Sequence, residues 1–397
     1  MKYAIVVMDG AADEPLAELD GQTPLEKASI PNTDWISKNG CLGIARMVPD
    51  GFSPGSDVAL MSLMGYDPGK YYTGRAPLEA AAQGIRTEPA DWIFRCNLVT
   101  IADGIMEDYS AGHIDTVQAA QLINDLNQQL GNDIITFYPG VSYRHLMVYK
   151  AAAYEDKISP PHDITDQPIS KYLPRGKHGK ELCRLMDRAN EILAHHEVNK
   201  VRSDLGENPA NSIWLWGQGH RPQMDNFKQK FGVSAAVITA VDLVRGLGKL
   251  ADMKNIAVAG ATGYLDTNYQ GKGQAAIEAL KEKDMVLVHV EAPDEAGHGA
   301  MLEEKIQAIE QIDKLIVGPL LGWLQKQPDN WRIMVLPDHP TPIRLRTHTA
   351  KPIPFAMAGA GVSSPRQYSY NEANAKATGL CIDKGHELME YFLKQTN

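Results

Sequence analysis

Aspartate and histidine residues follow three apolar runs of this 397-residue chain, at the points where those runs end. They are Asp9, the pair Asp294 and His298, and the pair Asp338 and His339. If the runs are strands of an open α/β sheet, their carboxyl ends face one crevice, which is where such sheets bind ligands. We therefore expect these carboxylates and imidazoles to converge on one site, together with His348.

The mixture of carboxylate and imidazole side chains indicates a metal site. Such mixed sets suit zinc, manganese or iron, because carboxylate is a hard ligand and imidazole a borderline one. Asp294 and His298 are four residues apart, so on a helical turn they share one face and can hold the same ion. Asp338 and His339 are adjacent, which suits a bend at the end of a strand.

Ser56 is a candidate nucleophile. It lies in the sequence Pro-Gly-Ser-Asp, directly ahead of an apolar helical pattern over residues 58–64. A serine in this position commonly caps a helix. However, a helix N-terminus also binds phosphate, and a hydroxyl beside a divalent ion can ionise and attack phosphorus.

The apolar runs that would position these residues are continuous rather than alternating, as in central strands that are covered on both faces. They span residues 3–8, 256–259, 285–290, 331–336 and 353–357. Helical patterns lie between them, over residues 274–283 and 302–325. This alternation predicts an α/β fold with a mostly parallel sheet flanked by helices.

The middle of the chain loses this alternation. It holds strand patterns over residues 92–100, 134–138 and 143–150, and helical patterns over residues 115–130 and 180–196. A proline-rich break separates the last strand from the last helix, at residues 159–168. We expect an inserted α+β domain at residues 86–209 and a core domain made of residues 1–85 and 210–397.

Composition narrows the class of protein. Lys plus Arg number 39 against 49 Asp plus Glu, and the resulting net charge of −10 argues against general nucleic-acid binding. The four cysteines form no C-x-x-C pair, as expected for free thiols in a reducing compartment. No signal-peptide pattern is present, and no run reaches the roughly 20 apolar residues of a membrane span. We expect a cytoplasmic monomer or small homo-oligomer that binds no membrane.

Short motifs are spread over nearly the whole chain. They are Met8-Asp9-Gly10, Thr23-Pro24-Leu25-Glu26, Pro54-Gly55-Ser56-Asp57, Gly65-Tyr66-Asp67-Pro68, Gly74-Arg75-Ala76-Pro77-Leu78-Glu79-Ala80, Gly260-Ala261-Thr262-Gly263, Asp266-Thr267-Asn268-Tyr269, the run from Pro293 to His298, Asp338-His339 and His348. In this order they resemble the 2,3-bisphosphoglycerate-independent phosphoglycerate mutases, in their archaeal-type branch, which are part of the alkaline phosphatase superfamily. The ordered set is far more specific than any single motif.

The resemblance implies two metal ions. One would be held by Asp294, His298 and His348, and the other by Asp9, Ser56, Asp338 and His339. Ser56 would also be the nucleophile that transiently carries the phosphoryl group. The family's ions are usually manganese, with zinc, magnesium or cobalt as variants. The family also implies a phosphatase-like core interrupted by a domain that grips the substrate.

The implied reaction interconverts 3-phosphoglycerate and 2-phosphoglycerate, a step shared by glycolysis and gluconeogenesis. Such a small phosphorylated substrate should need arginine, whose planar fork matches carboxylate and phosphate. The candidate substrate-binding residues are Arg95, Arg144 and His145 in the insert, and Arg75 and Lys272 in the core. His113, His162 and Asp163 could orient the glycerate.

Two stretches depart from the family pattern. The chain reads Pro340-Thr341-Pro342 after the Asp-His pair, a form that resembles a bacterial subgroup proposed to act as homoserine kinases. The insert also reads Tyr109-Ser110-Ala111-Gly112-His113 where archaeal-type mutases carry more arginine. The alternative is therefore a homoserine kinase-like phosphotransferase, or a phosphatase, on the same metal core. A kinase would have to bind ATP without a G-x-x-x-x-G-K-[ST] loop, which the sequence lacks. A third possibility is a metal-binding protein without activity.

Overall fold

The computed structural model describes residues 1–150, 158–176, 178–327, 330–363 and 367–394. The chain forms two compact units, one made of Met1–Tyr72 and Gln223–Asn397 and the other of Thr73–Pro222. The first unit is thus assembled from two separate segments of the chain.

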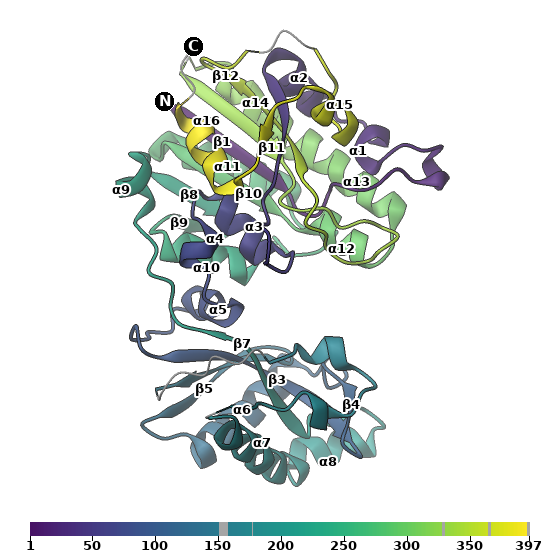
Figure 1. Ribbon diagram of the computed structural model, residues 1–397, viewed down its shortest axis with the longest axis vertical. Helices are drawn as coiled ribbons and strands as arrows, with labels where there is room; N and C mark the ends of the chain where they lie inside the picture. Colours follow the sequence, from purple (N-terminus) through teal and green to yellow (C-terminus); the bar gives the residue numbers. More distant parts are fainter. Residues whose placement is uncertain (151–157, 177, 328–329, 364–366, 395–397) are drawn as a thin grey trace. The chain divides into compact units, whose positions relative to one another are not determined.

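The first unit is built on an eight-stranded sheet in the order β13-β2-β12-β11-β1-β10-β8-β9. In chain order the strands are β1 (Lys2–Met8), β2 (Cys41–Ala45), β8 (Ala235–Ile238), β9 (Lys254–Ile256), β10 (Met285–Val290), β11 (Trp331–Leu336), β12 (Ile353–Gly359) and β13 (Cys381–Ile382). Strand β12 is antiparallel to β11 and β2, and the other pairs are parallel. Figure 1 shows β1, in purple, between β10 and β11. The predicted α/β class with a mostly parallel sheet is confirmed.

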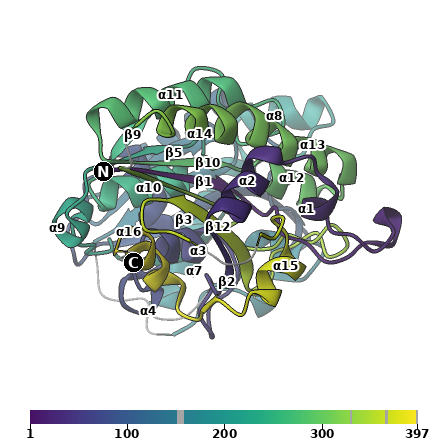
Figure 2. The same ribbon diagram turned by 90° about the horizontal axis from the view of Figure 1, so that it is seen from above.

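Strand β1 shows why the strand residues are apolar on both faces. Ala4, Val6 and Met8 belong to the large core cluster, and the intervening Ile5 and Val7 are just as buried on the opposite face. Helices cover both faces, with α11 and α14 on one side and α3, α10 and α16 on the other (Figure 2). Their bounds are α3 (Ser56–Leu63), α10 (Asp242–Leu250), α11 (Tyr269–Glu282), α14 (Gly318–Leu324) and α16 (Leu388–Lys394).

The helix expected over residues 302–325 is interrupted. It consists of α13 (Leu302–Ile312), a π-helical turn η4 (Asp313–Val317) and α14. Pro319 has no backbone N–H to donate to the carbonyl of Leu315, so a regular α-helical ladder cannot continue here. Helix α11 comes close at this turn, because a Cβ on Gly273 would lie 2.4 Å from the Leu315 carbonyl oxygen.

Short helices and turns complete the first unit. They are η1 (Ala17–Leu19), α1 (Pro24–Lys27), α2 (Pro31–Asn39), α4 (Pro68–Tyr71), α9 (Phe227–Phe231), α12 (Ala292–His298), α15 (Glu372–Ala377) and η5 (Gly385–Glu387). The strand expected at residues 256–259 ends at Ile256, and the chain then turns at Gly260, where φ is +71°. The sequence interpretation did not single out β2, β8 and β13, which have five, four and two residues.

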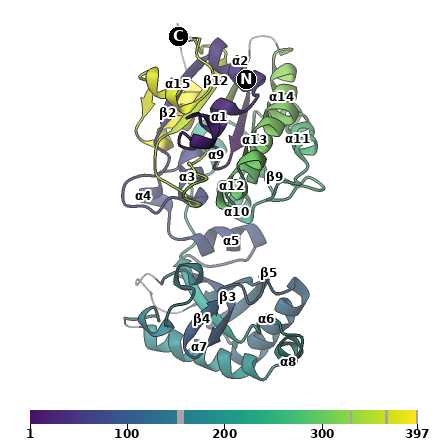
Figure 3. The ribbon, with the colours of Figure 1, turned by 90° about the vertical axis from the view of Figure 1, so that its right-hand side faces the viewer.

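The second unit holds a five-stranded antiparallel sheet. Its strands are β3 (Trp92–Ala102), β4 (Ile105–Asp108), β5 (Ile135–Val141), β6 (Arg144–Tyr149) and β7 (Ser212–Gly219), and its helices are α5 (Arg75–Gln83), η2 (Pro161–Ile164), η3 (Ile169–Lys171), α6 (Thr116–Leu130), α7 (Gly179–Ala194) and α8 (Glu197–Asp204). Helices α6 and α7 cover one face of the sheet and α5 lies on the other (Figure 3). None of the helices in the described parts of the chain is long and apolar enough to cross a bilayer.

The second unit is larger than the insertion expected at residues 86–209. It also contains residues 73–85 and 210–222, which were expected in the core. The reason is that β7 pairs with β3, and α5 packs on both of these strands. The sequence interpretation missed β7 and so placed the boundary inside this sheet.

Candidate functional site

Two groups of carboxylate and imidazole side chains lie at the carboxyl ends of β1, β10 and β11. Among the residues that the structure describes, two groups bring their ligand atoms within 4.8 Å of one another. We call them the Asp294 cluster (Asp294, His298 and His348) and the Asp9 cluster (Asp9, Asp338 and His339). The structure thus brings together the six Asp and His residues that the sequence predicts as ligands, in the same two sets.

The Asp294 cluster is built on α12, whose spacing puts Asp294 and His298 on one face. His298 Nε2 lies 3.3 Å from Asp294 Oδ2, and His348 Nε2 lies 3.5 Å from Asp294 Oδ1. The two histidine Nε2 atoms are 2.8 Å apart. Burial would raise the pKa of Asp294, but hydrogen bonds from both imidazoles hold it well below its usual value. The same bond to Asp294 raises the pKa of His298 to about 9, so binding a cation here would release a proton.

The Asp9 cluster is fully buried. His339 Nε2 lies 3.5 Å from Asp9 Oδ1 and 3.4 Å from Asp338 Oδ2. Asp338 Oδ1 accepts the backbone N–H groups of Gly10 and His339, at 3.3 and 2.9 Å. Two of the other three carboxylate oxygens, Asp9 Oδ1 and Asp338 Oδ2, accept no hydrogen bond from any described residue. Burial and the neighbouring carboxylates, first Asp338, raise the pKa of Asp9 well above its usual value.

These observations fit a cation in the Asp9 cluster. An isolated carboxylate is costly to bury without a hydrogen bond or a positive charge. Asp9 and Asp338 each leave one buried oxygen without a donor, and both of these oxygens lie within about 3.5 Å of His339 Nε2. A divalent ion with oxygen and nitrogen ligands would satisfy all three atoms.

Ser56 lies beside the Asp9 cluster. Its Oγ is 3.1 Å from His339 Nε2 and 3.4 Å from Asp9 Oδ2. It is the first residue of α3, and Gly55 takes the N-cap position, so the capping role considered for Ser56 does not apply. The hydroxyl is therefore directed to the cluster at the N-terminus of a helix, where backbone N–H groups favour an anion.

His289 is a member of the site that sequence reasoning missed. It lies inside β10, is fully buried, and its Nε2 lies 2.8 Å from Asp9 Oδ2. Burial lowers its pKa to about 4, so the ring is neutral and donates from Nε2 to the carboxylate. Thr239 Oγ1 accepts the backbone N–H of Val241 at 3.0 Å and lies 3.2 Å from His289 Nδ1, which it can serve as a donor. A histidine in the middle of an apolar strand gives no spacing signal that distinguishes it from a core residue.

Gly10 allows β1 and α12 to approach each other. Its φ is +64°, and a Cβ at this position would lie 2.5 Å from Asp294 Oδ1 and 2.7 Å from Asp294 Cα. A side chain here would therefore push apart the two segments that carry Asp9 and Asp294.

Lys272 lies within the first unit and is almost fully buried. Its Nζ donates to the backbone carbonyl of His289 at 3.1 Å. Burial lowers its pKa to about 8, against a nearby Glu291 that raises it. The ammonium group thus lies against β10, the strand that carries His289, whose ring contacts Asp9.

Three of the other predicted substrate-binding residues, Arg75, Arg95 and Arg144, form a cationic group on the second unit. Glu79 pairs with two arginines, with distances of 3.2 Å to Arg75 Nε and 3.0 Å to Arg95 Nε. Burial lowers the pKa of the Arg95 guanidinium to about 10. Glu79 opposes this shift, and the nearby Arg75 and Arg144 add to it. Arg75 therefore belongs to the second unit and not to the core. Residues Arg75, Glu79, Arg95 and Arg144 are called the arginine group below.

Aromatic rings surround the arginine group. The guanidinium of Arg95 lies 4.3 Å from the centre of the Trp216 ring, and that of Arg144 lies 5.7 Å from Tyr143. His162 packs on Trp216, with ring centres 5.4 Å apart. The remaining ring contacts join His113 to Tyr143 and Tyr109 to both Tyr143 and His162.

Two predicted binding residues differ from this pattern. His145 is buried and accepts the backbone N–H of Gly140 at Nδ1, at 2.9 Å. Along β6 it points to the face opposite that of Arg144, because successive strand residues alternate. Asp163 follows His162 and is exposed, with one carboxylate oxygen 3.7 Å from the His162 ring. Asp163 therefore lies at the edge of the ring cluster, whereas His145 lies inside the second unit.

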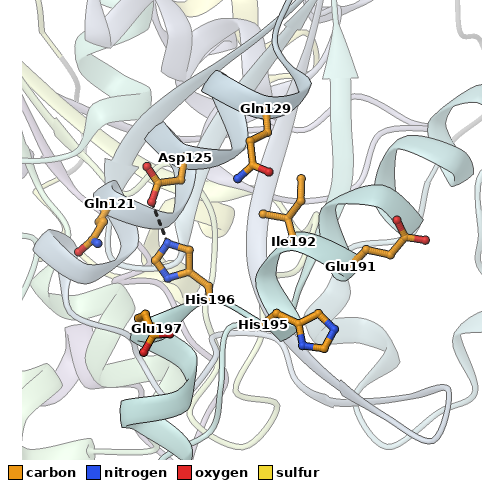
Figure 4. A pocket seen from close by; sticks show the side chains of 8 residues that line it. All are labelled: Gln121, Asp125, Gln129, Glu191, Ile192, His195, His196 and Glu197. Atoms are coloured by element: carbon orange, nitrogen blue, oxygen red, sulfur yellow. Dashed lines mark hydrogen bonds and ion pairs between the residues drawn. The ribbon is translucent and has the colours of Figure 1, made fainter.

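A separate pocket of about 610 Å³ lies elsewhere on the second unit, between α6, α7 and the start of α8 (Figure 4). It is lined by Gln121, Asp125, Gln129, Glu191, Ile192, His195, His196 and Glu197. His196 Nε2 lies 2.7 Å from Asp125 Oδ2, and its Nδ1 accepts the N–H of Val198. His196 therefore joins two helices, and the pocket shares no residue with the arginine group.

The chain is similar to known proteins over nearly its whole length. A family model described as 2,3-bisphosphoglycerate-independent phosphoglycerate mutase matches residues 37–199. A probable 2,3-bisphosphoglycerate-independent phosphoglycerate mutase of Geobacter sulfurreducens is 48% identical over an alignment of 398 positions, which covers 99% of this chain and 100% of that relative. A solved protein of Pyrococcus horikoshii is similar over 100% of this chain and 98% of its own, with a TM-score of 0.83 and 27% identity. The solved cofactor-independent phosphoglycerate mutase of Thermoplasma acidophilum covers 100% of both chains, with a TM-score of 0.66 and 26% identity. With nearly half of its residues identical to a full-length relative, the chain belongs to the family of 2,3-bisphosphoglycerate-independent phosphoglycerate mutases.

Proposed function

We propose that this protein interconverts 3-phosphoglycerate and 2-phosphoglycerate by passing the phosphoryl group through Ser56. The observation that carries the proposal is the position of Ser56 Oγ, 3.1 Å from His339 Nε2 and 3.4 Å from Asp9 Oδ2, at the start of α3. The relatives reported above carry the name of this activity, which supports the choice of substrate.

Two divalent ions are proposed as cofactors, manganese first, with zinc, magnesium or cobalt as substitutes. One would be held by the Asp294 cluster, and the other by the Asp9 cluster together with Ser56. When bound, the ions would stabilise negative charge on the attacking oxygen and on the oxygens of the transferring phosphoryl group.

In the first half of the reaction, Ser56 Oγ forms a bond to phosphorus while the bond from phosphorus to O3 of 3-phosphoglycerate breaks. Ser56 Oγ loses its proton in this step, and the released O3 of glycerate takes one up. In the second half, O2 of glycerate loses its proton and forms a bond to phosphorus while the bond from phosphorus to Ser56 Oγ breaks, which gives 2-phosphoglycerate. Ser56 recovers a proton, so the cycle consumes nothing.

Recognition of the substrate is proposed for the arginine group and its rings on the second unit. Three guanidinium groups against one carboxylate leave this group cationic, and burial of Arg95 strengthens its pull on an anion. Its planar forks match a carboxylate or a phosphate. His113, His162 and Asp163 would orient the glycerate on the second unit. Within the first unit, Lys272, whose Nζ donates to the His289 carbonyl, is proposed as a further substrate-binding residue.

The proposal is tested with Ser56→Ala. Purified protein loaded with Mn²⁺ is given 3-phosphoglycerate, and 2-phosphoglycerate is followed through a coupled enolase reaction. We expect turnover in the wild type and in Ser62→Ala, which makes the same change at a buried serine of the same helix, and none above background in Ser56→Ala. Intact-mass measurement should detect one added phosphoryl group in the wild type but not in Ser56→Ala.

Two results would contradict this proposal. Turnover by Ser56→Ala equal to that of the wild type would show that Ser56 is not the nucleophile. Absence of mutase turnover in the wild type, with consumption of ATP that depends on homoserine, would replace the mutase by the homoserine kinase-like alternative. Elemental analysis tests the ligands separately, because an Asp338→Ala, His339→Ala double variant should lose one of the two ions.

A further inference from the structure

Thr341, in the loop after β11, touches a ligand of each metal cluster. Its Oγ1 donates a short hydrogen bond to Asp294 Oδ1, and the same oxygen lies 3.3 Å from His339 Nδ1. The side chain is fully buried. A single hydroxyl therefore connects the Asp294 cluster to the Asp9 cluster.

The number of available protons fixes the direction of both bonds. A threonine hydroxyl has one proton, and a carboxylate ligand can only accept. The proton of Thr341 therefore goes to Asp294, so Thr341 Oγ1 must accept from His339. His339 then carries its hydrogen on Nδ1 and leaves the lone pair of Nε2 free. That Nε2 atom is the one that lies 3.1 Å from Ser56 Oγ and 3.4 Å from Asp338 Oδ2.

The backbone of Thr341 is held from two sides, which keeps this hydroxyl in place. Its N–H group lies 3.3 Å from the carbonyl oxygen of Gly10 and 3.2 Å from that of Ala12. Its carbonyl accepts from Lys305 Nζ at 2.8 Å, and the same ammonium group binds Asp13 at 2.8 Å. Lys305 is fully buried, so this support cannot move without exposing or unpairing a charge.

We propose that Thr341 is a positioning residue shared by the two clusters. Its hydroxyl orients the Asp294 carboxylate and selects the His339 tautomer whose Nε2 can bind a cation, so both sites depend on one oxygen atom. The inference rests on the two-metal site of the proposed function and extends it, because it predicts that the two ions bind as a coupled pair. Histidines that bind metals generally donate their second ring N–H to such a partner.

Calorimetric titration of the metal-free protein with Mn²⁺ tests the proposal. Thr341→Ser keeps the hydroxyl and Thr341→Ala removes it, so the two variants differ in one oxygen atom. We expect Thr341→Ser to bind two ions, each with an affinity within a few-fold of its affinity for the wild type. In Thr341→Ala we expect both binding steps to weaken, each by about 10–100-fold.

Thr33→Ala is the matched control. Thr33 is also fully buried, and its Oγ1 donates to Asp313 Oδ1 at 2.7 Å, but this carboxylate belongs to neither cluster. Its loss should leave both Mn²⁺ affinities unchanged. Thermal unfolding of each metal-free variant shows whether it is folded. If Thr341→Ala is not, Thr341→Val, which keeps the volume of threonine, takes its place against Thr341→Ser.

The outcomes separate this inference from the proposed function. Wild-type affinity for both ions in Thr341→Ala would overturn the inference, as would a loss confined to one site. Equal weakening in Thr341→Ser and Thr341→Ala would assign the effect to packing and would also overturn it. A wild type that binds no ion would overturn both the inference and the proposed metal site, whereas a wild type with two ions and no mutase turnover would overturn the proposed function alone.

Discussion

Asp9 receives a different neighbour at each of its oxygens. His289 Nε2 lies 2.8 Å from Oδ2, whereas Oδ1 is buried without a donor and faces His339 at 3.5 Å. The first contact fixes the rotation of the carboxylate, and the second oxygen is left for a cation. His289 therefore acts on the site through Asp9.

At His289 we predict a loss of metal affinity. His289→Leu removes the donor to Asp9 Oδ2 and should weaken binding of Mn²⁺ by about 10–100-fold, as removal of such supporting groups generally does. His289→Gln keeps an N–H donor and should retain most of the affinity. Calorimetric titration of the two variants measures the difference, and equal affinities would show that the bond to Asp9 does not matter.

The sequence predicts the residues of the Asp294 cluster and the Asp9 cluster but not the groups that hold them. Asp9, Asp294 and Asp338 follow long apolar strands, so their convergence follows from sheet topology alone. His289 and Thr341 have no such signal, because one lies within an apolar strand and the other in an irregular loop. Their roles depend on hydrogen bonds across the fold, which no spacing along the chain encodes.

At the scale of elements, α11 and the π-helical turn η4 pack closely against each other. Helix α11 approaches the π-helical turn η4 at Gly273, where a Cβ would lie 2.4 Å from the Leu315 carbonyl oxygen. The sequence predicts the helical character of residues 302–325, but it does not predict the π-helical turn. That turn depends on Pro319 and on the way η4 packs against α11.

Gly273→Ala should therefore destabilise the first unit. Alanine favours a helix over glycine by about 0.5–1 kcal/mol, but the clash with a backbone oxygen should cost about 1–3 kcal/mol. Gly322→Ala is the control, because that glycine lies in α14 with no atom within 4 Å of its Cβ position, and it should stabilise the protein slightly. Urea denaturation of the two variants should shift in opposite directions.

Strand β6 carries a pH-sensitive residue. Burial lowers the pKa of His145 to about 3, compared with about 6.5 in an unfolded chain. Above pH 6.5 the ring is neutral in both states and has no effect. Below pH 6.5 only the unfolded state takes up the proton, so stability falls as the pH decreases towards 3.

His145→Asn isolates this effect, because its Oδ1 can still accept the N–H of Gly140 while nothing titrates. Between pH 7.5 and pH 5 we expect the wild type to lose about 2 kcal/mol more stability than His145→Asn. Urea denaturation at both pH values gives the comparison. Parallel pH dependence in the two proteins would mean that His145 is protonated within the folded state.

At the scale of the whole molecule, each unit has its own hydrophobic core. The sequence predicts an inserted domain because the α/β alternation is lost, but it misses β7, whose pairing with β3 sets the boundary. Since both metal clusters lie in the first unit, metal should stabilise that unit alone.

We therefore predict different responses of the two units to metal. A fragment with residues 73–222 should fold, and its unfolding temperature should be the same in Mn²⁺ and in EDTA. In the full chain, each bound Mn²⁺ ion should add roughly 2.7 kcal/mol to the stability of the first unit when Mn²⁺ is at about 100 times the dissociation constant of its site. Calorimetric scans with and without EDTA measure both effects. A metal-dependent shift in the fragment would place a further metal site in the second unit.

The central position of β1 in its sheet has a consequence for the synthesis of the protein. Tyr3 is paired in register with Met285 on one side and with Arg332 on the other, so β1 has neither of its partner strands until these residues are made. At about 5–20 residues per second, that delay is roughly 15–60 s, during which the second unit can already fold. Through this interval both edges of the apolar strand are unpaired, and such edges are prone to aggregation. The two proposed metal sites can form only after translation has passed His339 and His348.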